Sequence, residues 1–385
     1  MLNLINQYRR YMEIKKDKQE IFKLLETMDL SIVKQSLPKK VENIVMVLPS
    51  VYSNLGGITS ALRILTYLQK QGCKVTIALS DTTQNVSEAK KNVKECMSEF
   101  SGAVKSIDDC TRENFDICIA TSWQTVYQAK KLKGYKIYFV QDYEPDFYET
   151  NDFSVLAKKT YSEGFHIISL GKWNVKKICE NVANSEMLKI DSIDFPYDKN
   201  EYQFNNRNYD LYADKKTIKI ACYIRYIGRR IPYICEYLLA KTKKELEKKG
   251  YDLQVYYFGI DKRNRFSEGT NLGKLSRTEL YKLYCECDFG MVASMSNISL
   301  VPYEMLGAGL PVIEFQDGSY PYFLGNDTAF LIGYDYKQLA DGLLELISCP
   351  EKLKEMHQKA AERIKMVSWE NTCKQFWKII TKACE

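Results

Sequence analysis

The chain has 385 residues, which is long for a single hydrophobic core and suits two domains of about 150 to 200 residues each. Its formal charge of +6 is mild, because Lys and Arg are spread among nearly as many acids without a recognised nucleic-acid motif, so no nucleic-acid partner is expected. The sequence has no apolar signal core and no membrane-spanning run, which predicts a cytoplasmic protein. Its 12 cysteines lack zinc-site spacing and its 2 histidines cannot build a His-rich centre, so neither a metal nor a cofactor is expected.

Residues 1–40 have the pattern of a charged amphipathic helix. The apolar residues at helical spacing are Leu2, Leu4, Ile5, Tyr8, Tyr11 and Met12, and the basic residues between them are Arg9, Arg10, Lys15, Lys16 and Lys18. Basic residues beside an apolar stripe suit the surface of an anionic membrane. Such a helix equally suits packing on its own domain or on a second subunit of a homodimer, so these alternatives stand beside membrane contact.

Residues 41–205 alternate short apolar runs with helical segments, which predicts a Rossmann-like domain. The expected strands are 43–48, 74–79, 116–120, 136–140 and 167–170, and the expected helices include 58–69 and 87–100. Parallel strands of such a domain end at one edge of the sheet, and ligands bind at that edge.

Two glycines, Gly56 and Gly57, stand in the turn between the first strand and the first helix. Glycine lets a backbone approach a ligand closely. The surrounding sequence lacks the dinucleotide fingerprint, which argues against a nicotinamide-dependent enzyme. Because Gly-Gly pairs are also common in ordinary turns, the spacing alone fits either a turn or a ligand contact.

Acidic and aromatic residues crowd the end of the strand at 136–140, where the segment 141–149 has the sequence QDYEPDFYE. Carboxylates hydrogen-bond sugar hydroxyls, and aromatic rings stack on the apolar face of a sugar ring. The segment therefore predicts a sugar site, with an acidic surface loop as the alternative. The residues assigned to an acceptor are Gln141, Tyr143, Phe147 and Tyr148, beside the carboxylates Asp142 and Glu144.

Residues 191–215 are polar and predict the linker to a second Rossmann-like domain, assigned to 206–367. The first strand of that domain leads directly to Arg225, Arg229 and Arg230. An arginine at the carboxyl edge of a strand can clamp a diphosphate with paired hydrogen bonds, so Arg225 and Arg229 are candidate donor-binding residues. Surface solvation is the alternative for either Arg229 or Arg230.

The stretch 288–313 predicts a buried strand, a polar loop over 294–299, a helix and the start of a further strand. Such a unit brings the loop and the helix N-terminus to the carboxyl edge of the sheet, where backbone N–H groups suit a phosphate. Glu304 in the first helical turn fits the hydroxyls of a ribose, or it simply complements the helix dipole. Asn297 and Ser299 of the loop are also assigned to the donor.

Residues 304–312, EMLGAGLPV, resemble the nucleotide-sugar signature E-A-M-A-x-G-x-P-V of the GT-B glycosyltransferases of the large family that includes sucrose synthases. That pattern usually has another Glu eight positions earlier, where this chain has Ser296. The segment 141–148, with the pattern Q-D-Y-E-P-x-F-Y, is most similar to WsaF-type bacterial rhamnosyltransferases, which lack the earlier Glu. The resemblance implies an α/β protein of the GT-B class, with two Rossmann-like domains facing a cleft.

The same resemblance assigns further positions. The Gly56-Gly57 loop would face the donor across the cleft, and Lys274, within Gly-Lys-Leu, would lie near the donor phosphates. A Ser-Trp corner would precede a last helix, 368–385, that crosses back to the first domain.

The helical pattern before that corner is charged, so His357 is expected at the surface. No D-x-D motif is present, which predicts catalysis without a divalent metal.

The expected function is transfer of a sugar from a nucleoside diphosphate donor to a growing bacterial surface or capsular polysaccharide. The likeness to rhamnosyltransferases points to dTDP-rhamnose as donor and to a saccharide acceptor, lipid-linked in one alternative. A nucleotide-sugar epimerase is a rival, but two histidines scarcely supply its acid–base groups. A non-catalytic GT-B subunit that stabilises a partner enzyme is a second rival, disfavoured because Arg225, Lys274 and Glu304 are present.

The chemistry needs a group that removes the proton of the acceptor hydroxyl. If configuration is inverted, Asp142 is the preferred base because it lies nearest the end of its strand, and Glu144 is the second candidate. If configuration is retained, the departing phosphate takes the proton, and the two acids only hold the sugar.

Overall fold

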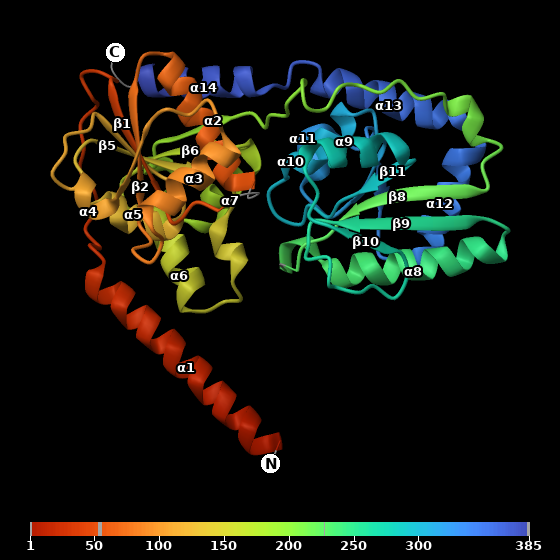
Figure 1. Ribbon diagram of the computed structural model, residues 1–385, viewed down its shortest axis with the longest axis horizontal. Helices are drawn as coiled ribbons and strands as arrows, with labels where there is room; N and C mark the ends of the chain where they lie inside the picture. The colour runs from red at the N-terminus through yellow and green to blue at the C-terminus, as the bar shows by residue number, and fades with distance from the viewer. Residues whose placement is uncertain (1, 53–55, 227, 383–385) are drawn as a thin grey trace.

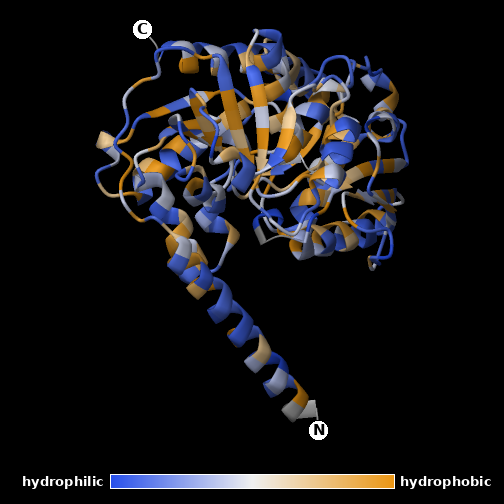
Figure 2. Ribbon diagram, turned by 60° about the vertical axis from the view of Figure 1, so that its left-hand side comes forward, coloured by the Kyte–Doolittle hydropathy of each residue, from blue (hydrophilic) through white to orange (hydrophobic). Residues whose placement is uncertain are grey.

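A computed structural model of the protein describes residues 2–52, 56–226 and 228–382. Residues 53–55, which belong to the expected Gly-Gly turn, and 383–385, at the end of the expected last helix, lie outside the described residues. Two lobes stand side by side, each with a sheet and surrounding helices, and a long N-terminal helix extends from the first lobe (Figure 1). Apolar residues are concentrated in the strands of both sheets (Figure 2).

The first lobe contains a seven-stranded sheet in the order β3-β2-β1-β4-β5-β6-β7, with every pairing parallel. Its strands are β1 (Asn43–Leu48), β2 (Lys74–Leu79), β3 (Ala103–Ser106), β4 (Ile117–Ala120), β5 (Tyr135–Val140), β6 (His166–Leu170) and β7 (Ile190–Ile193). Every residue of β4, β5 and β6 is buried, because helices cover both faces of the sheet. This explains why these strands are nearly continuous apolar runs in the sequence.

Helices and short 3-10 turns connect these strands. The α-helices are α2 (Gly56–Lys70), α3 (Val86–Cys96), α4 (Ile107–Cys110), α5 (Trp123–Ala129), α6 (Asp152–Lys159) and α7 (Lys172–Asn181). The 3-10 turns are η1 (Glu144–Phe147), η2 (Thr160–Ser162) and η3 (Ser185–Met187). The strand order reverses between β1 and β4, so the chain leaves these two neighbouring strands toward opposite faces and opens a crevice at their carboxyl ends.

The second lobe contains a six-stranded parallel sheet in the order β10-β9-β8-β11-β12-β13. Its strands are β8 (Thr217–Tyr223), β9 (Asp252–Phe258), β10 (Thr270–Gly273), β11 (Phe289–Met291), β12 (Val312–Phe315) and β13 (Phe330–Ile332). Its helices and turns are η4 (Tyr209–Tyr212), η5 (Gly228–Arg230), α8 (Pro232–Lys248), α9 (Arg277–Glu286), α10 (Leu300–Gly307), α11 (Tyr320–Leu324), α12 (Tyr336–Ser348) and α13 (Pro350–Ile364). Here the order reverses between β8 and β11, again opening a crevice at the carboxyl ends.

The last helix, α14 (Trp369–Lys382), returns to the first lobe, as the resemblance implied (Figure 1). It packs beside α2 and β7. Phe376 is fully buried and meets Phe139 of β5 edge to face, with ring centroids 5.8 Å apart. The chain therefore has the predicted class, an α/β protein with two Rossmann-like domains, an N-terminal helical extension and a C-terminal crossover helix.

The N-terminal helix is shorter than the pattern predicted. α1 (Leu2–Thr27) ends well before residue 40, and no helix follows before β1. Asp29 accepts a hydrogen bond from the backbone N–H of Ser31 at 2.9 Å, and Lys130 of the first domain donates to the carbonyls of both residues. These contacts fix a turn against the domain, so the charged segment cannot continue as a helix.

His357 does not lie at the surface, contrary to the expectation from its charged helix. It is 8% exposed, and its Nδ1 lies 2.7 Å from the hydroxyl of Tyr209 in η4. Burial and the nearby Arg207 lower the pKa of His357 to about 4. The sequence could not show this, because the residue that covers it belongs to the distant linker.

Candidate functional site

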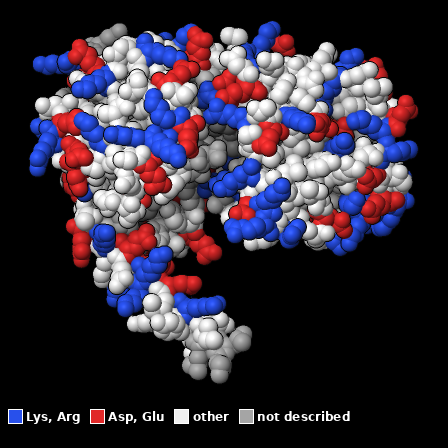
Figure 3. All heavy atoms as spheres, in the orientation of Figure 1, with Lys and Arg blue, Asp and Glu red and all other residues white. Residues whose placement is uncertain are grey.

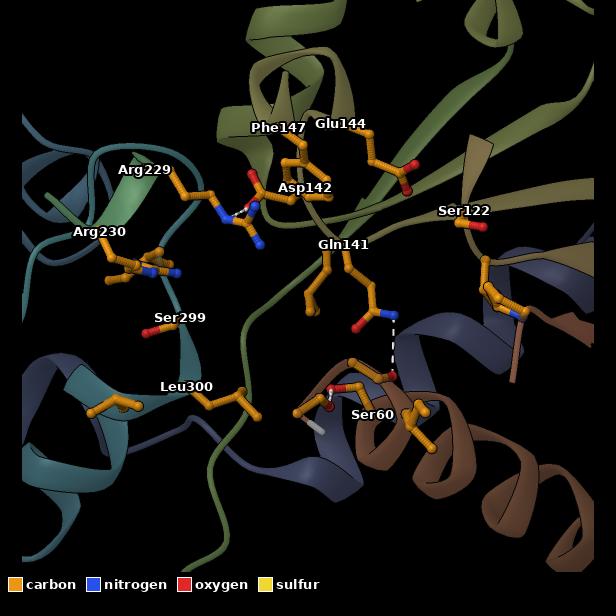
Figure 4. Close-up of a pocket in the computed structure, with 18 of the residues that line it drawn as sticks. Ser60, Ser122, Gln141, Asp142, Glu144, Phe147, Arg229, Arg230, Ser299 and Leu300 are labelled. Atoms are coloured by element: carbon orange, nitrogen blue, oxygen red, sulfur yellow. Dashed lines mark hydrogen bonds and ion pairs between the residues drawn. The ribbon is translucent and has the colours of Figure 1, made fainter. Parts of the chain in front are cut away.

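A cavity of about 620 Å³ lies between the two lobes, where the carboxyl ends of both sheets face each other. Figure 3 shows the hollow between the lobes, and Figure 4 shows the lining side chains. Residues from the first domain that line it include Gly56, Gly57, Ser60, Ser122, Trp123, Gln124, Gln141, Asp142, Glu144, Phe147 and Tyr148. Residues from the second domain that line it include Tyr223, Arg229, Arg230, Ile298, Ser299, Leu300, Val301 and Glu304.

The second-domain wall of the cavity, which the sequence assigned to the donor, includes the predicted strand, loop, helix and strand unit, now β11, α10 and β12. Ser299 is the N-cap residue of α10, and no side-chain cap bond satisfies the first turn. Its hydroxyl is buried without a hydrogen-bond partner and lies at the cavity wall (Figure 4). Free N–H groups of the first turn, together with this hydroxyl, form a surface that suits a phosphate.

Glu304 lies one turn further along α10 and also lines the cavity. It is half-buried, and burial together with the nearby charge of Glu201 raises the pKa of its carboxyl to about 7. Arg277 and the hydroxyl of Tyr202 oppose that shift. A carboxylate placed so near a helix N-terminus but facing a cavity fits two vicinal hydroxyls of a ribose.

Arg229 and Arg230 both face the cavity, so neither is a solvated surface residue. Arg230 is 7% exposed, and its Nη1 donates to the carbonyl of Ala293 at 3.0 Å. Arg225 follows the end of β8 as predicted, but it is not among the residues that line the cavity. Lys274 follows the edge strand β10, is exposed and also lies outside the lining.

The buried carboxylate of Glu314 hydrogen-bonds the start of the loop at 294–299. Glu314 of β12 is fully buried, and it accepts hydrogen bonds from the hydroxyl of Ser294 at 2.6 Å and from the backbone N–H of Ser294 at 3.1 Å. Burial raises its pKa to about 7, and the charge of Arg230 acts in the opposite direction. Ser319 holds the other side of the same turn by donating to the carbonyl of Ser294. The sequence reasoning missed this support.

The acidic and aromatic segment at the end of β5 meets the second domain directly. Asp142 accepts hydrogen bonds from the hydroxyl of Ser296 at 3.0 Å and from the backbone N–H of Asn297 at 3.1 Å. Its Oδ2 also lies 3.3 Å from Nε of Arg229, forming an ion pair (Figure 4). Asp142 thus lines the cavity as predicted, but its carboxylate is already engaged by the opposite domain.

Asn297 joins the domains rather than pointing freely at a ligand. It is 1% exposed, and its Nδ2 donates to the carbonyls of Gln141 and Leu170, both at 2.8 Å. Gln141 in turn donates from Nε2 to the carbonyl of Gly57 at 3.2 Å (Figure 4). Gly56 and Gly57, which were expected in a turn, are the first residues of α2, and this helix start, the end of β5 and the loop before α10 are tied into one wall.

Glu144 is 6% exposed and accepts a hydrogen bond at 2.7 Å from the backbone N–H of Trp123, the first residue of α5. It therefore caps a helix with a side chain from the neighbouring strand end. Burial is the main reason that its pKa rises to about 8, so the acid is largely protonated at neutral pH. The structure gives Glu144 a clear structural contact and brings its carboxyl to the cavity wall.

The predicted acceptor aromatics divide into two groups. Tyr143 is 4% exposed and stacks on Tyr161 in the core, with ring centroids 5.6 Å apart, and it is not among the residues that line the cavity. Phe147 and Tyr148 do line the cavity. The hydroxyl of Tyr148 accepts from Nε1 of Trp123 at 3.1 Å.

Sequence reasoning missed several lining residues of the first domain. Ser122, Trp123 and Gln124 start α5 at the carboxyl end of β4, where the strand order reverses. A signal was present, since Thr121 and Ser122 follow a short apolar run in the way that N-cap residues do. The pairing of Ser296 with Asp142 had no signal, because it depends on how the two domains meet.

Comparison with known proteins agrees with this architecture. Residues 43–172 match the family model for the WsaF N-terminal domain. The O-antigen biosynthesis protein RfbC of Myxococcus xanthus is 27% identical over 267 residues, which are 66% of this chain but 20% of that protein. The chain therefore spans about one fifth of the length of this curated relative.

Solved structures share the fold over most of their length. The Anabaena protein HepE in complex with UDP and glucose has a TM-score of 0.67 at 12% identity, covering 88% of this chain and 99% of that one. Sucrose-phosphate synthase from Thermosynechococcus elongatus has a TM-score of 0.66 at 12% identity, covering 89% and 98%. TarM of S. aureus, in complex with fondaparinux, alpha-GlcNAc-glycerol and UDP, has a TM-score of 0.67 at 10% identity, covering 88% and 100%.

In the described part of the chain, no helix is both long and apolar enough to cross a membrane.

The family match in the first domain and the shared two-domain architecture agree with the sequence resemblance. The chain thus has the GT-B fold of two Rossmann-like domains, and its residues 43–172 are similar to the WsaF N-terminal domain.

Proposed function

We propose that the protein is a glycosyltransferase of polysaccharide biosynthesis, which uses a nucleoside diphosphate sugar as donor. The observation that carries this proposal is the cavity between the domains, where Glu304, Ser299 and Arg229 line one wall. The carboxylate can accept hydrogen bonds from ribose hydroxyls, and the helix N-terminus and the guanidinium suit phosphates, so the arrangement matches the ribose and the diphosphate of a nucleoside diphosphate. The O-antigen biosynthesis relative and the neighbour HepE, which was solved with UDP and glucose, support the same function.

We infer that the donor is dTDP-rhamnose. The support is the Q-D-Y-E-P-x-F-Y segment at 141–148, which resembles the WsaF-type rhamnosyltransferases, together with the match of residues 43–172 to the WsaF N-terminal domain. HepE and TarM were solved with UDP, which is also a pyrimidine nucleoside diphosphate. A site for a pyrimidine base is therefore compatible with this fold.

The donor charge would be met by protein groups, without a divalent cation. Arg229 and Arg230 face the same cavity as the N-terminus of α10. As the sugar leaves the diphosphate, negative charge grows on the departing phosphate, and these preorganised groups would stabilise it. Arg225 and Lys274 lie outside the present lining, and we propose that they contribute only if the cleft closes further.

Asp142 remains the preferred candidate for the base that deprotonates the acceptor hydroxyl, because its carboxylate faces the cavity opposite α10. Glu144 is a weaker candidate for a base, since a pKa of about 8 keeps it largely protonated at neutral pH. We propose that Glu144 mainly fixes the start of α5 and so positions Trp123.

We further propose that the acceptor is a saccharide carried on a lipid at an anionic membrane surface. Every side chain from Ile5 to Glu20 of α1 is exposed, including Tyr8 at 64% and Tyr11 at 59%. The base of this helix is fixed near the acceptor side, because Leu24 and Met28 pack on the cluster that contains Trp123 and Tyr148. A membrane that held α1 would therefore lie near the acceptor aromatics.

Titration of the protein with dTDP, UDP and GDP by isothermal calorimetry tests the donor assignment. We expect dTDP to bind most tightly, and tighter binding of UDP or GDP would overturn the choice of base. Failure of all three nucleotides to bind would favour the non-catalytic subunit. Incubation with the sugar nucleotide alone tests the epimerase, because isomerisation of the sugar without an acceptor would establish that activity.

A further inference from the structure

Arg229 is held by two residues of the opposite domain. Oδ2 of Asp142 lies 3.3 Å from its Nε, and its guanidinium lies 3.8 Å from the ring centroid of Phe147. Both partners belong to the segment that the sequence assigned to the acceptor, whereas Arg229 belongs to the donor domain. Arg229 therefore contacts both residues that were assigned to the acceptor side, as Figure 4 shows.

The ion pair is partly buried but poorly aligned. The side chains of Arg229 and Asp142 are 21% and 13% exposed, so water screens their attraction only in part. Nε of Arg229 nevertheless has no aligned hydrogen-bond partner. A phosphate that accepted two parallel N–H bonds from the guanidinium would form a stronger contact than this one.

Asp142 is also attached to the loop that precedes α10. It accepts from Ser296 and Asn297, which lie a few residues before the N-cap residue Ser299. The donor loop, Arg229 and the acceptor segment are therefore linked through a single carboxylate.

We propose that residues 141–147 form a donor-controlled clasp, in which the diphosphate of the donor takes Arg229 from Asp142 and Phe147. This exposes to the acceptor the ring of Phe147 and the side of Asp142 Oδ2 that Arg229 covers, while Ser296 and Asn297 keep their hydrogen bonds to Asp142. This inference rests on the proposed function, and it predicts that the donor binds before the acceptor. No covalent bond changes in this step, since an anionic ligand only replaces an anionic side chain as the partner of the arginine. Phe147 then presents its ring to the cavity for stacking on a sugar.

The first test is titration with inorganic pyrophosphate and with dTDP by isothermal calorimetry. Asp142→Asn keeps a hydrogen-bond acceptor but removes the competing charge, so both ligands should bind about three- to tenfold more tightly than to the parent protein. Ser296→Ala is the matched control, because it removes a bond between the domains without changing charge. We expect its affinities to stay within about twofold of the parent.

The second test is amide hydrogen exchange across 141–148. Saturating pyrophosphate should make this segment exchange faster in the parent protein, although a ligand is bound, and Asp142→Asn should exchange fast without any ligand. Equal affinity of parent and Asp142→Asn, or greater protection of the segment on binding, would overturn the clasp. If pyrophosphate binds and speeds exchange in residues 141–148 but no nucleotide binds, the donor assignment fails and the clasp stands. If pyrophosphate does not bind, the clasp fails.

Discussion

Asp142 at the end of β5 forms an ion pair with Arg229 of the second domain, with 3.3 Å between Oδ2 and Nε. The contact joins the acidic segment at the acceptor side to the arginine group at the donor side. Neither residue is free of partners in the structure. The cleft is therefore bridged by an ion pair with which a nucleoside diphosphate would compete.

Arg229→Ala should weaken binding of a nucleoside diphosphate about ten- to a hundredfold, which corresponds to the loss of one or two charge-assisted hydrogen bonds. Arg225→Ala is the matched control, since Arg225 is close in sequence but does not line the cavity. Calorimetric titration of both variants decides between them. A larger loss in Arg225→Ala would mean that the donor phosphates lie elsewhere.

Glu304→Gln should weaken nucleotide binding by about 1.5–3 kcal/mol for each hydrogen bond to ribose that depends on the charge. The pKa of this carboxyl is raised to about 7, so the ionised form becomes dominant as pH rises through that value. Affinity of the parent protein should therefore increase from about pH 6 to about pH 8, and the increase should be smaller in Glu304→Gln. Titrations of both proteins across this range measure the difference. Identical affinities at every pH would reduce Glu304 to a charge on its helix.

Glu144→Gln should change how stability depends on pH. The folded-state pKa of about 8 lies above the ordinary value of 4.5, so the folded protein keeps a proton that the unfolded chain releases between these values. Stability of the parent protein therefore falls as pH rises through this window, by up to about 1.4 kcal/mol per pH unit for this group. The neutral glutamine retains an oxygen to accept from Trp123 and should lack that contribution.

Urea unfolding at a series of pH values measures this effect for the parent and for Glu144→Gln. Glu149→Gln, which changes an exposed acid in the same segment, is the control. The stability of Glu144→Gln relative to the parent should increase steadily toward pH 8. Parallel curves for the two proteins would show that Glu144 is not a buried protonated acid.

Deletion of residues 1–20 should abolish binding to vesicles that contain phosphatidylglycerol and leave nucleotide affinity unchanged. The deletion removes exposed Tyr8, Tyr11 and the basic residues but keeps Ile21, which is 8% exposed against the body. Co-sedimentation should show binding that weakens as salt is raised. Equal binding by both proteins would contradict the membrane proposal, and a change from dimer to monomer in sedimentation equilibrium would show that α1 instead joins two copies.

Much of the fold followed from local pattern. The strands at 43–48 and 74–79 coincide with β1 and β2, because fully buried parallel strands are continuous apolar runs. The expected helix after the loop at 294–299 is α10, which begins directly after that loop at Leu300. Local chemistry at such a unit is strong enough to identify a strand, a loop and a helix N-terminus.

The candidate site was less predictable, because its main contacts depend on how the domains meet. Asn297 was assigned to the donor, yet it donates to carbonyls that lie 156 and 127 positions away in the sequence. Tyr143 has an aromatic ring that could stack on a sugar, but this ring stacks on Tyr161 instead. Strand-end position identified the neighbourhood of each residue, whereas the direction of its side chain required the tertiary structure.

The central claim is that the protein transfers a sugar from a nucleoside diphosphate, and product analysis tests it most directly. The protein would be incubated with dTDP-rhamnose and a lipid-linked saccharide, and the products would be examined by NMR and mass spectrometry. We predict that a new glycosidic bond forms together with dTDP, and that Arg229→Ala and Glu304→Gln both reduce its yield. Release of dTDP without a glycosylated product, or conversion of the sugar in the absence of any acceptor, would contradict this account.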